Sequence, residues 1–232
     1  MKFARLASLA LLTGTACTPL KMAVPADLAT DTDVIQVTDR SRMTGALANE
    51  SFKMAPYEVT NVDRKWNSSE NRSVLVYSSS ETKTGYSFTF KGPQGDAKAQ
   101  CGSQSQENNT HVKGFDFTRS QDAIGCACEG AAASSKIQIT ATDGGNYGGQ
   151  VTAHANNFTV TAVMKYENGM QAQNPVGYEF RGEKLIGAVE VANPGRLWLS
   201  KTLDDQTRAD LACLAAGLLL YLPPKKDGMP AI

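Results

Sequence analysis

The sequence predicts a mainly β domain, an antiparallel barrel of about twelve strands with a hydrophobic C-terminal helix buried inside it. Short segments rich in β-branched and aromatic residues follow one another over residues 57–200, separated by polar or Gly/Pro connectors. No helical pattern interrupts them, which excludes a βαβ sheet and favours a meander closed as a barrel or folded as a sandwich. One long apolar helix then follows, over residues 203–222.

The N-terminal residues have the three parts of a secretory signal. Lys2 and Arg5 precede an apolar run over residues 6–12, and small residues then lead to Cys17. Cleavage after Ala16 therefore divides the chain into a signal peptide over residues 1–16, a tether over 17–32 and a single β-rich domain over 33–232. Pro, Ala, Thr and Asp without periodicity are typical of such a tether.

The residues before Cys17 resemble the lipobox of bacterial lipoproteins, in which the cysteine after the cleavage point receives palmitate-containing lipid. Thr15 and Ala16 fit this motif, whereas Gly14 stands where leucine is usual. The resemblance implies lipidation of Cys17 and a place in the bacterial cell envelope, as a membrane-anchored lipoprotein with the outer membrane favoured. The alternative is an ordinary signal cut after Ala16, which would leave the protein in the periplasm.

The cysteine count predicts disulfides. The chain has five cysteines, so lipidation of Cys17 would leave four, and an oxidising compartment favours bonds between them. A direct bond between Cys126 and Cys128 would strain so short a loop. We therefore expect Cys101 to pair with one of these two and Cys213 with the other. The alternative is one disulfide and a buried free Cys213.

The predicted strands alternate buried and exposed positions and are joined by turn residues. Residues 88 and 90 place two phenylalanines on one face, and Ile124, Cys126 and Cys128 share another. Gly and Asn between later strands supply the positive φ angles that tight hairpins need. The predicted strands lie at residues 57–62, 73–79, 86–91, 97–101, 112–118, 123–129, 136–142, 147–154, 158–166, 177–181, 184–191 and 196–200, with a further short strand or apolar clip at 34–38.

The C-terminal helix is apolar on every side. Residues 211–222 contain no charge, whereas a surface helix would show a polar face. This part spans only about 18 Å, well short of the ~30 Å hydrocarbon core of a bilayer. We therefore expect protein around it, with Leu211, Leu214, Leu218 and Leu219 in the core.

This combination of strands and a terminal helix resembles the tubby-like barrel shared by tubby proteins, phospholipid scramblases and LURP-one-related proteins. The likeness rests on residues 184–189, 197–199, 204–205 and 208–221, and on the strand count elsewhere. It implies a helix running through the barrel. No basic phosphoinositide-binding cluster matches here, so headgroup recognition is not carried over. The alternative fold is a β-sandwich with one packed helix.

The sequence predicts a binding protein without catalytic residues, metal site or cofactor. Lysines and arginines number 23, as do aspartates and glutamates, so no net charge favours nucleic acid. With only His111 and His154, the chain has no HExxH, and it lacks a GxSxG elbow and a P-loop.

We expect the membrane as one partner, through the lipid anchor, and an envelope protein or lipid as another. Binding would fall to rim loops at residues 67–72 and 103–111. The alternatives are an envelope hydrolase that uses carboxylates, and a metal or redox protein that uses Cys101, Cys126 and Cys128.

Overall fold

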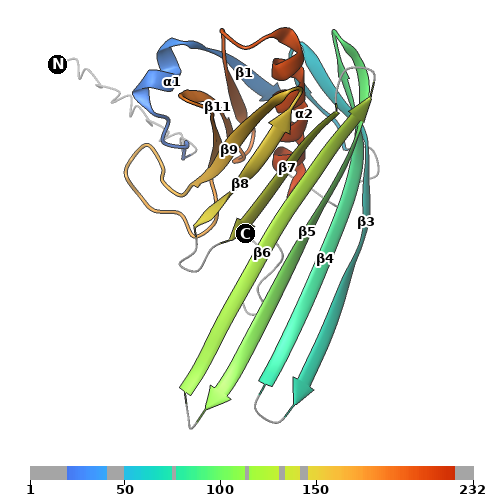
Figure 1. The fold of residues 1–232 in the computed structure, drawn as a ribbon, viewed down its shortest axis with the longest axis vertical. Helices are drawn as coiled ribbons and strands as arrows, with labels where there is room; N and C mark the ends of the chain where they lie inside the picture. The colour runs from blue at the N-terminus through green and yellow to red at the C-terminus, as the bar shows by residue number, and fades with distance from the viewer. Residues whose placement is uncertain are drawn as a thin grey trace, which may run out of the picture.

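The computed structural model describes residues 20–40, 50–74, 77–112, 115–130, 134–141 and 146–222. Within these residues, twelve antiparallel strands form a closed barrel in chain order, and β1 completes the ring by pairing with both β2 and β12 (Figure 1). The predicted fold class is confirmed, and the alternative sandwich is wrong. The strands are β1 Thr32–Thr38, β2 Phe52–Met54, β3 Tyr57–Val74, β4 Tyr77–Gly92, β5 Gly95–Val112, β6 Phe115–Gly130, β7 Ser134–Ala141, β8 Tyr147–Ala153, β9 Asn156–Val163, β10 Gly177–Arg181, β11 Leu185–Glu190 and β12 Arg196–Ser200.

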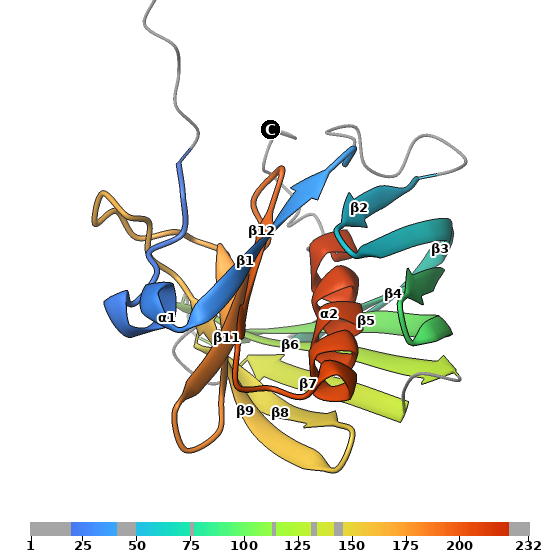
Figure 2. The same cartoon turned by 90° about the horizontal axis from the view of Figure 1, so that it is seen from above.

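The C-terminal helix, α2 (Asp205–Leu220), fills the barrel (Figure 2). Leu211, Leu214, Leu218 and Leu219 are at most 1% exposed, and they share one core cluster with inward-facing residues of the surrounding strands. Burial of each leucine contributes about 1.5–3 kcal/mol. No helix among the described residues is both long and apolar enough to cross a membrane.

Polar side chains fix the first turns of α2. Asp204 caps the helix by accepting hydrogen bonds from the backbone N–H and hydroxyl of Thr207, at 2.8 and 2.7 Å, and these bonds lower the pKa of its carboxyl. Asp210 is fully buried, which raises its pKa. It accepts hydrogen bonds from the backbone N–H of His154 and from Gln206. Asp210 therefore attaches the helix to the β8–β9 turn.

Two arginines meet the opposite end of α2. Arg40 donates to the carbonyl oxygen of Leu219, and Arg64 donates to that of Leu220 at 3.0 Å. Glu50 accepts from the Arg64 Nε at 2.9 Å. Cations at the C-terminus of a helix oppose the negative end of its dipole and bind carbonyls that lack helical partners. This end of the helix is therefore held by the mouth of the barrel.

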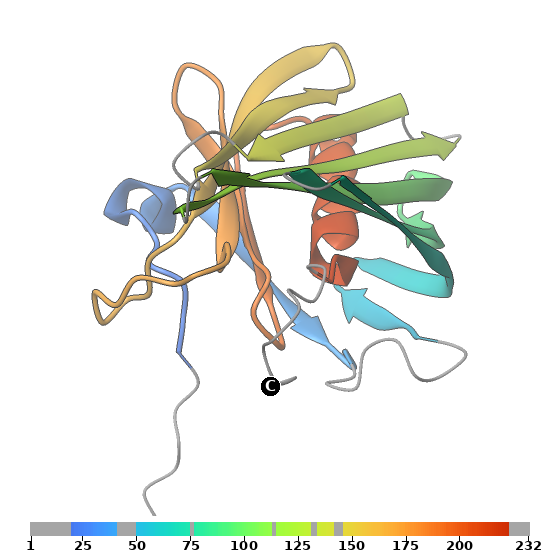
Figure 3. The same cartoon turned by 90° about the horizontal axis from the view of Figure 1, so that it is seen from below.

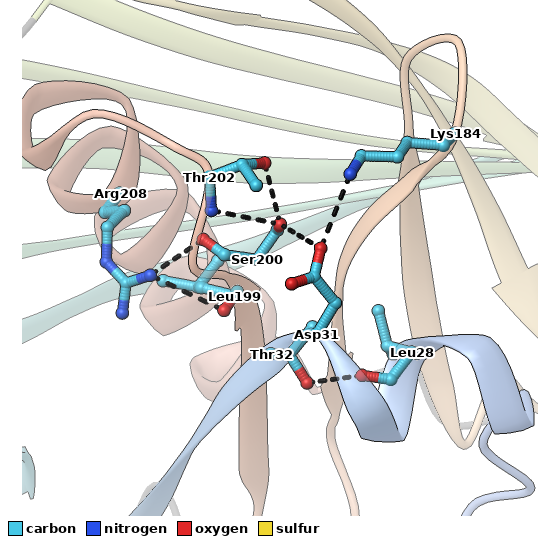
Figure 4. A network of polar contacts seen from close by, with 8 residues as sticks. All are labelled: Leu28, Asp31, Thr32, Lys184, Leu199, Ser200, Thr202 and Arg208. Atoms are coloured by element: carbon cyan, nitrogen blue, oxygen red, sulfur yellow. Dashed lines mark hydrogen bonds and ion pairs between the residues drawn. The ribbon is translucent and has the colours of Figure 1, made fainter.

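A polar network joins the first strand to the last (Figure 4). Arg208 of α2 donates to the carbonyl oxygens of Leu199 and Ser200, at 3.5 and 2.8 Å. Asp31, just before β1, accepts from the Ser200 hydroxyl at 3.5 Å and from the Lys184 ammonium at 3.4 Å. These contacts reinforce the β1–β12 pairing that closes the barrel.

The part of the predicted tether that the structure describes, residues 20–31, lies against the outside of the barrel. It contains the short helix α1 (Ala26–Thr30). Met22 and Leu28 are buried in a second apolar cluster with Trp198. The backbone N–H of Met22 donates to Glu190 at 2.6 Å, and Glu190 also accepts from Arg196. Apolar packing thus begins before residue 33.

Strands β3 to β6 have 16 to 18 residues each and extend beyond the barrel as two adjoining hairpins (Figures 1 and 3). The structure corrects three details of the sequence prediction. Residues 73–79 and 112–118 are not single strands but span the ends of the β3–β4 and β5–β6 hairpins. The predicted rim loops at 67–72 and 103–111 lie within β3 and β5. Finally, β2 was not predicted.

Candidate ligand-binding groove

The cysteines are paired as the sequence predicts. Cys101 is bonded to Cys126, and Cys128 is bonded to Cys213. The alternative of a free Cys213 is therefore wrong. The two disulfides fit an oxidising compartment. Cys17 lies outside the described residues.

No group of three or more His, Cys, Asp or Glu side chains in the described part of the chain is arranged to hold a metal ion. Cys101, Cys126 and Cys128 are in disulfides and so present no thiolate. Of the two histidines, His111 belongs to β5, and His154 is exposed in the β8–β9 turn with φ of 53°.

A groove of about 950 Å³ crosses the outer face of β5 to β9. Buried residues such as Ile124 and Ile137 point into the barrel, so their sequence neighbours point outward and line the groove. Its volume is at the upper end of the range for small-molecule sites. The outward-facing lining residues are Gln100, Gly102, Gln104, Ala123, Gly125, Ala127, Lys136, Gln138, Gln150, Thr152 and Asn157.

A row of three glycines runs into the floor of the groove, and its last two members, Gly102 and Gly125, line the groove. Gly85 of β4 is paired with Gly102 of β5, which is paired with Gly125 of β6. The same row continues around the barrel wall, through Gln138 on β7 and Gln150 on β8. Three strands in succession therefore lack a side chain at one level of the sheet.

The fold itself leaves room for side chains at two of these glycines. A Cβ atom added to Gly85 or Gly125 would meet only a backbone oxygen, at 3.9 and 3.8 Å. A Cβ atom on Gly187, by contrast, would lie 2.7 Å from the Trp198 carbonyl oxygen. Glycine inside a strand weakens it, and it often marks a bend or a close approach by another molecule. The row fits a bend, because it lies where β4 to β6 leave the barrel. It also fits close approach by another molecule, because it leaves the outer face without side chains.

The rows on either side carry further polar side chains of the groove. Gln104 is paired with Ala123 on one side. On the other side, Gln100 is paired with Ala127, and Ala127 with Lys136. The groove thus combines an apolar floor of glycine and alanine with amide groups that both donate and accept hydrogen bonds. Lys136 is the single charged residue among the lining residues.

A disulfide makes this floor rigid. Cys101 and Cys126 face each other on β5 and β6, next to the pair formed by Gly102 and Gly125. On the inner side, the disulfide packs against Gly217 of α2, where an added Cβ atom would lie 2.9 Å from the Cys101 Sγ. Tyr86 donates to the Gly217 carbonyl oxygen at 2.7 Å. Pre-organisation of this kind lowers the entropic cost of binding.

Three buried or partly buried tyrosines lie outside the set of groove-lining residues. Tyr147 donates to the Asp122 carboxylate at 2.9 Å, and burial together with this carboxylate raises the pKa of Tyr147 to about 12. Burial also raises the pKa of Tyr178 and Tyr221. These phenols remain protonated at neutral pH, so they do not act as bases, and Tyr147 is a hydrogen-bond donor.

Sequence reasoning did not find the groove. Its residues come from five strands, and their alignment depends on register, which is set by the whole barrel. The one available signal was the presence of Gly85, Gly102 and Gly125 inside otherwise regular strand patterns. Comparison with family models, with curated proteins and with solved structures finds no match to the chain.

Proposed function

We propose that this protein is an exported, lipid-anchored protein of the bacterial cell envelope that binds a partner or ligand without catalysing a reaction. The observation that carries the proposal is the groove on the outer face, with its rigid floor and amide lining. The rim loops expected from the sequence are replaced in this proposal by a surface formed by strands.

The filled interior favours an external site. Many barrels hold their ligand inside, but here α2 occupies the centre, and its residues from Leu211 to Leu220 are all buried. A ligand therefore meets the barrel from outside. The groove has the volume and the hydrogen-bonding groups for this purpose.

The side chains of the groove suit binding better than catalysis. Glutamine, threonine and asparagine recognise hydroxyl and amide groups by hydrogen bonds, and they do not exchange protons at neutral pH. A neutral polar ligand would match this lining, with Lys136 available for one negative charge.

The anchor is tested by substitution of the modified residue. Cys17→Ala is expected to move the protein from the membrane fraction to the soluble periplasmic fraction, because the acylated cysteine is gone. The measurement is fractionation of cells followed by immunoblotting, with Lys21→Ala as the control, because it changes an exposed residue of the tether and keeps Cys17. Unchanged membrane retention of Cys17→Ala would contradict lipid anchoring.

The groove is tested by site-specific photo-cross-linking in intact cells. A benzophenone amino acid in place of Gln138 is expected to give a defined cross-linked product, because this residue lines the groove. Gln36, an exposed glutamine of β1, is the matched control and should give no such product. Gly125→Leu should abolish the product at Gln138 while leaving the melting temperature close to that of the wild type, since the fold has room for this Cβ atom.

Two results would contradict binding in the groove. One is an identical set of products from Gln138 and Gln36. The other is an undiminished product at Gln138 when Gly125→Leu fills the floor. Either result would leave the anchor experiment unaffected, so membrane attachment and ligand binding are judged separately.

A further inference from the structure

The described end of the tether is joined to the loop between β9 and β10, residues 164–176. Met22 and Tyr166 form an antiparallel bridge, and backbone hydrogen bonds of 3.0 and 2.9 Å flank it on both sides. These bonds join residue 23 to residue 165 and residue 21 to residue 167. The two segments lie side by side in Figures 2 and 3. The tether is therefore attached to the barrel from residue 21 onward.

Buried contacts hold this attachment in place. The Met22 side chain is fully buried and lies over Gly177, where an added Cβ atom would collide with its Sδ atom. The Met22 N–H donates to the Glu190 carboxylate at 2.6 Å, and Leu28 is buried further along the tether. Release of the tether would expose this apolar surface and leave a buried carboxylate without a donor. Residues 21–31 therefore do not form a flexible linker between Cys17 and the barrel.

The attachment leaves little chain between the barrel and Cys17. Leu20 is three residues after Cys17 in the sequence. Three residues of fully extended chain span at most about 11 Å. A lipid on Cys17 would therefore hold Leu20, and the surface of the barrel around it, close to the membrane.

Two exposed apolar side chains lie at this end of the barrel. Leu20 is 45% exposed, and Met170, in the β9–β10 loop, is 49% exposed. Because the bridge is antiparallel, its register places Leu20 opposite Asn168, two residues before Met170. Among the residues whose exposure the structure describes, the other large apolar side chains on the surface are Val34 and Leu222. Two of these four side chains are therefore gathered beside the point of attachment.

Hydrogen bonds fix the turn that carries Met170. The Tyr166 N–H donates to the Met170 carbonyl oxygen at 2.9 Å, and the Met170 N–H donates to the Asn168 Oδ1 at 3.1 Å. Gly169 between them has φ of 86°, a left-handed conformation that glycine adopts without strain. The fold thus presents Met170 at an exposed turn, and contact of its side chain with lipid requires no rearrangement of the barrel.

We infer that Leu20 and the turn at residues 168–170 contact the membrane surface, with the Met170 side chain inserted at the boundary between headgroups and acyl chains. This inference rests on the proposed lipid anchor at Cys17. The length of the chain selects lipid as the occupant of this surface, because a single helix with its side chains is already about 10–12 Å across. The contact does not have to be strong, since the anchor keeps these side chains at a high effective concentration beside the lipid.

This contact leaves the groove accessible. The β9–β10 loop follows Val163 at one end of β9, whereas the groove residue Asn157 lies near the other end of that strand. Six residues of strand at ~3.3 Å each separate the two positions by about 20 Å. A ligand can therefore reach this end of the groove without displacing the turn from the membrane.

The test uses the full chain, purified from the envelope with its lipid and reconstituted into vesicles of phosphatidylethanolamine and phosphatidylglycerol. Met170→Cys is labelled with an environment-sensitive fluorophore. The label reacts at one position, because Cys17 carries the lipid and the other four cysteines are in disulfides. The emission of this label is expected to shift to shorter wavelength on reconstitution, and lipids that carry a nitroxide near the headgroup should quench it.

Ala155→Cys is the matched control, because Ala155 is exposed in the β8–β9 turn at the far end of β9. Its label should show neither the shift nor the quenching. Leu20→Cys supplies a second position at the proposed contact and should respond as Met170→Cys does. All three residues are exposed, so the variants are expected to keep the melting temperature of the wild type.

Flotation of the vesicles on a density gradient separates this inference from the anchor itself. Protein that floats with the vesicles, but whose Met170 and Ala155 labels show the same emission and quenching, would overturn the membrane contact and leave the anchor standing. Protein that fails to float with the vesicles would overturn both.

Discussion

Ala216→Arg is expected to abolish folding. Ala216 lies in the C-terminal half of α2 and is fully buried among apolar residues of the barrel. An arginine there would enter a closed interior with no carboxylate on the same turn, and the uncompensated burial of a charge costs several kcal/mol. Domains of this kind are stable by only about 5–15 kcal/mol. Circular dichroism and the yield of soluble protein measure the outcome.

A control substitution separates the effect of position from that of arginine itself. Gln206→Arg introduces the same side chain into the first turn of α2, where Gln206 is partly exposed and contacts Asp210. This variant is expected to fold. If Ala216→Arg were soluble and unfolded cooperatively near the wild-type midpoint, the helix could not be enclosed as described.

The sequence predicted the buried elements correctly where a single continuous segment shows an apolar pattern. The apolar circumference of residues 211–222 predicted an enclosed helix, and the absence of other long helices predicted an antiparallel barrel around it. Disulfide pairing followed because Cys126 and Cys128 are too close in the chain to bond to each other. Each of these inferences needed only local pattern or simple geometry.

Long-range register was not accessible in this way. The pattern around residues 73–79 and 112–118 is strand-like, yet these segments span hairpin ends. Polar strands that extend beyond the apolar core carry no hydrophobic alternation to mark their length. The predicted number of strands, about twelve, agrees with the barrel. This agreement is partly fortuitous, because β2 was not predicted while residues 73–79 and 112–118 were each counted as a strand. The groove depends on the same register, so its residues could be found only once the strands were aligned.

The two disulfides differ in the elements that they join. Cys128 lies on β6 and Cys213 on α2, with Cα atoms 6.5 Å apart, so this bond attaches the central helix to the barrel wall. Cys101 and Cys126 instead join two strands that are already neighbours. Strand β6 contributes a cysteine to both bonds. The rigid floor of the groove and the position of the helix therefore depend on the same strand.

Removal of the Cys128–Cys213 bond is consequently expected to cost more stability than removal of the Cys101–Cys126 bond. The sequence separations are 85 and 25 residues, and loop-closure entropy gives losses of about 4.5 and about 3.5 kcal/mol. The comparison uses the double alanine variants of each pair, Cys128→Ala with Cys213→Ala and Cys101→Ala with Cys126→Ala. Urea unfolding measures the free energies. An equal or larger loss for the short-loop pair would mean that support of the strands at the groove, rather than tethering of the helix, dominates the contribution of these bonds to stability.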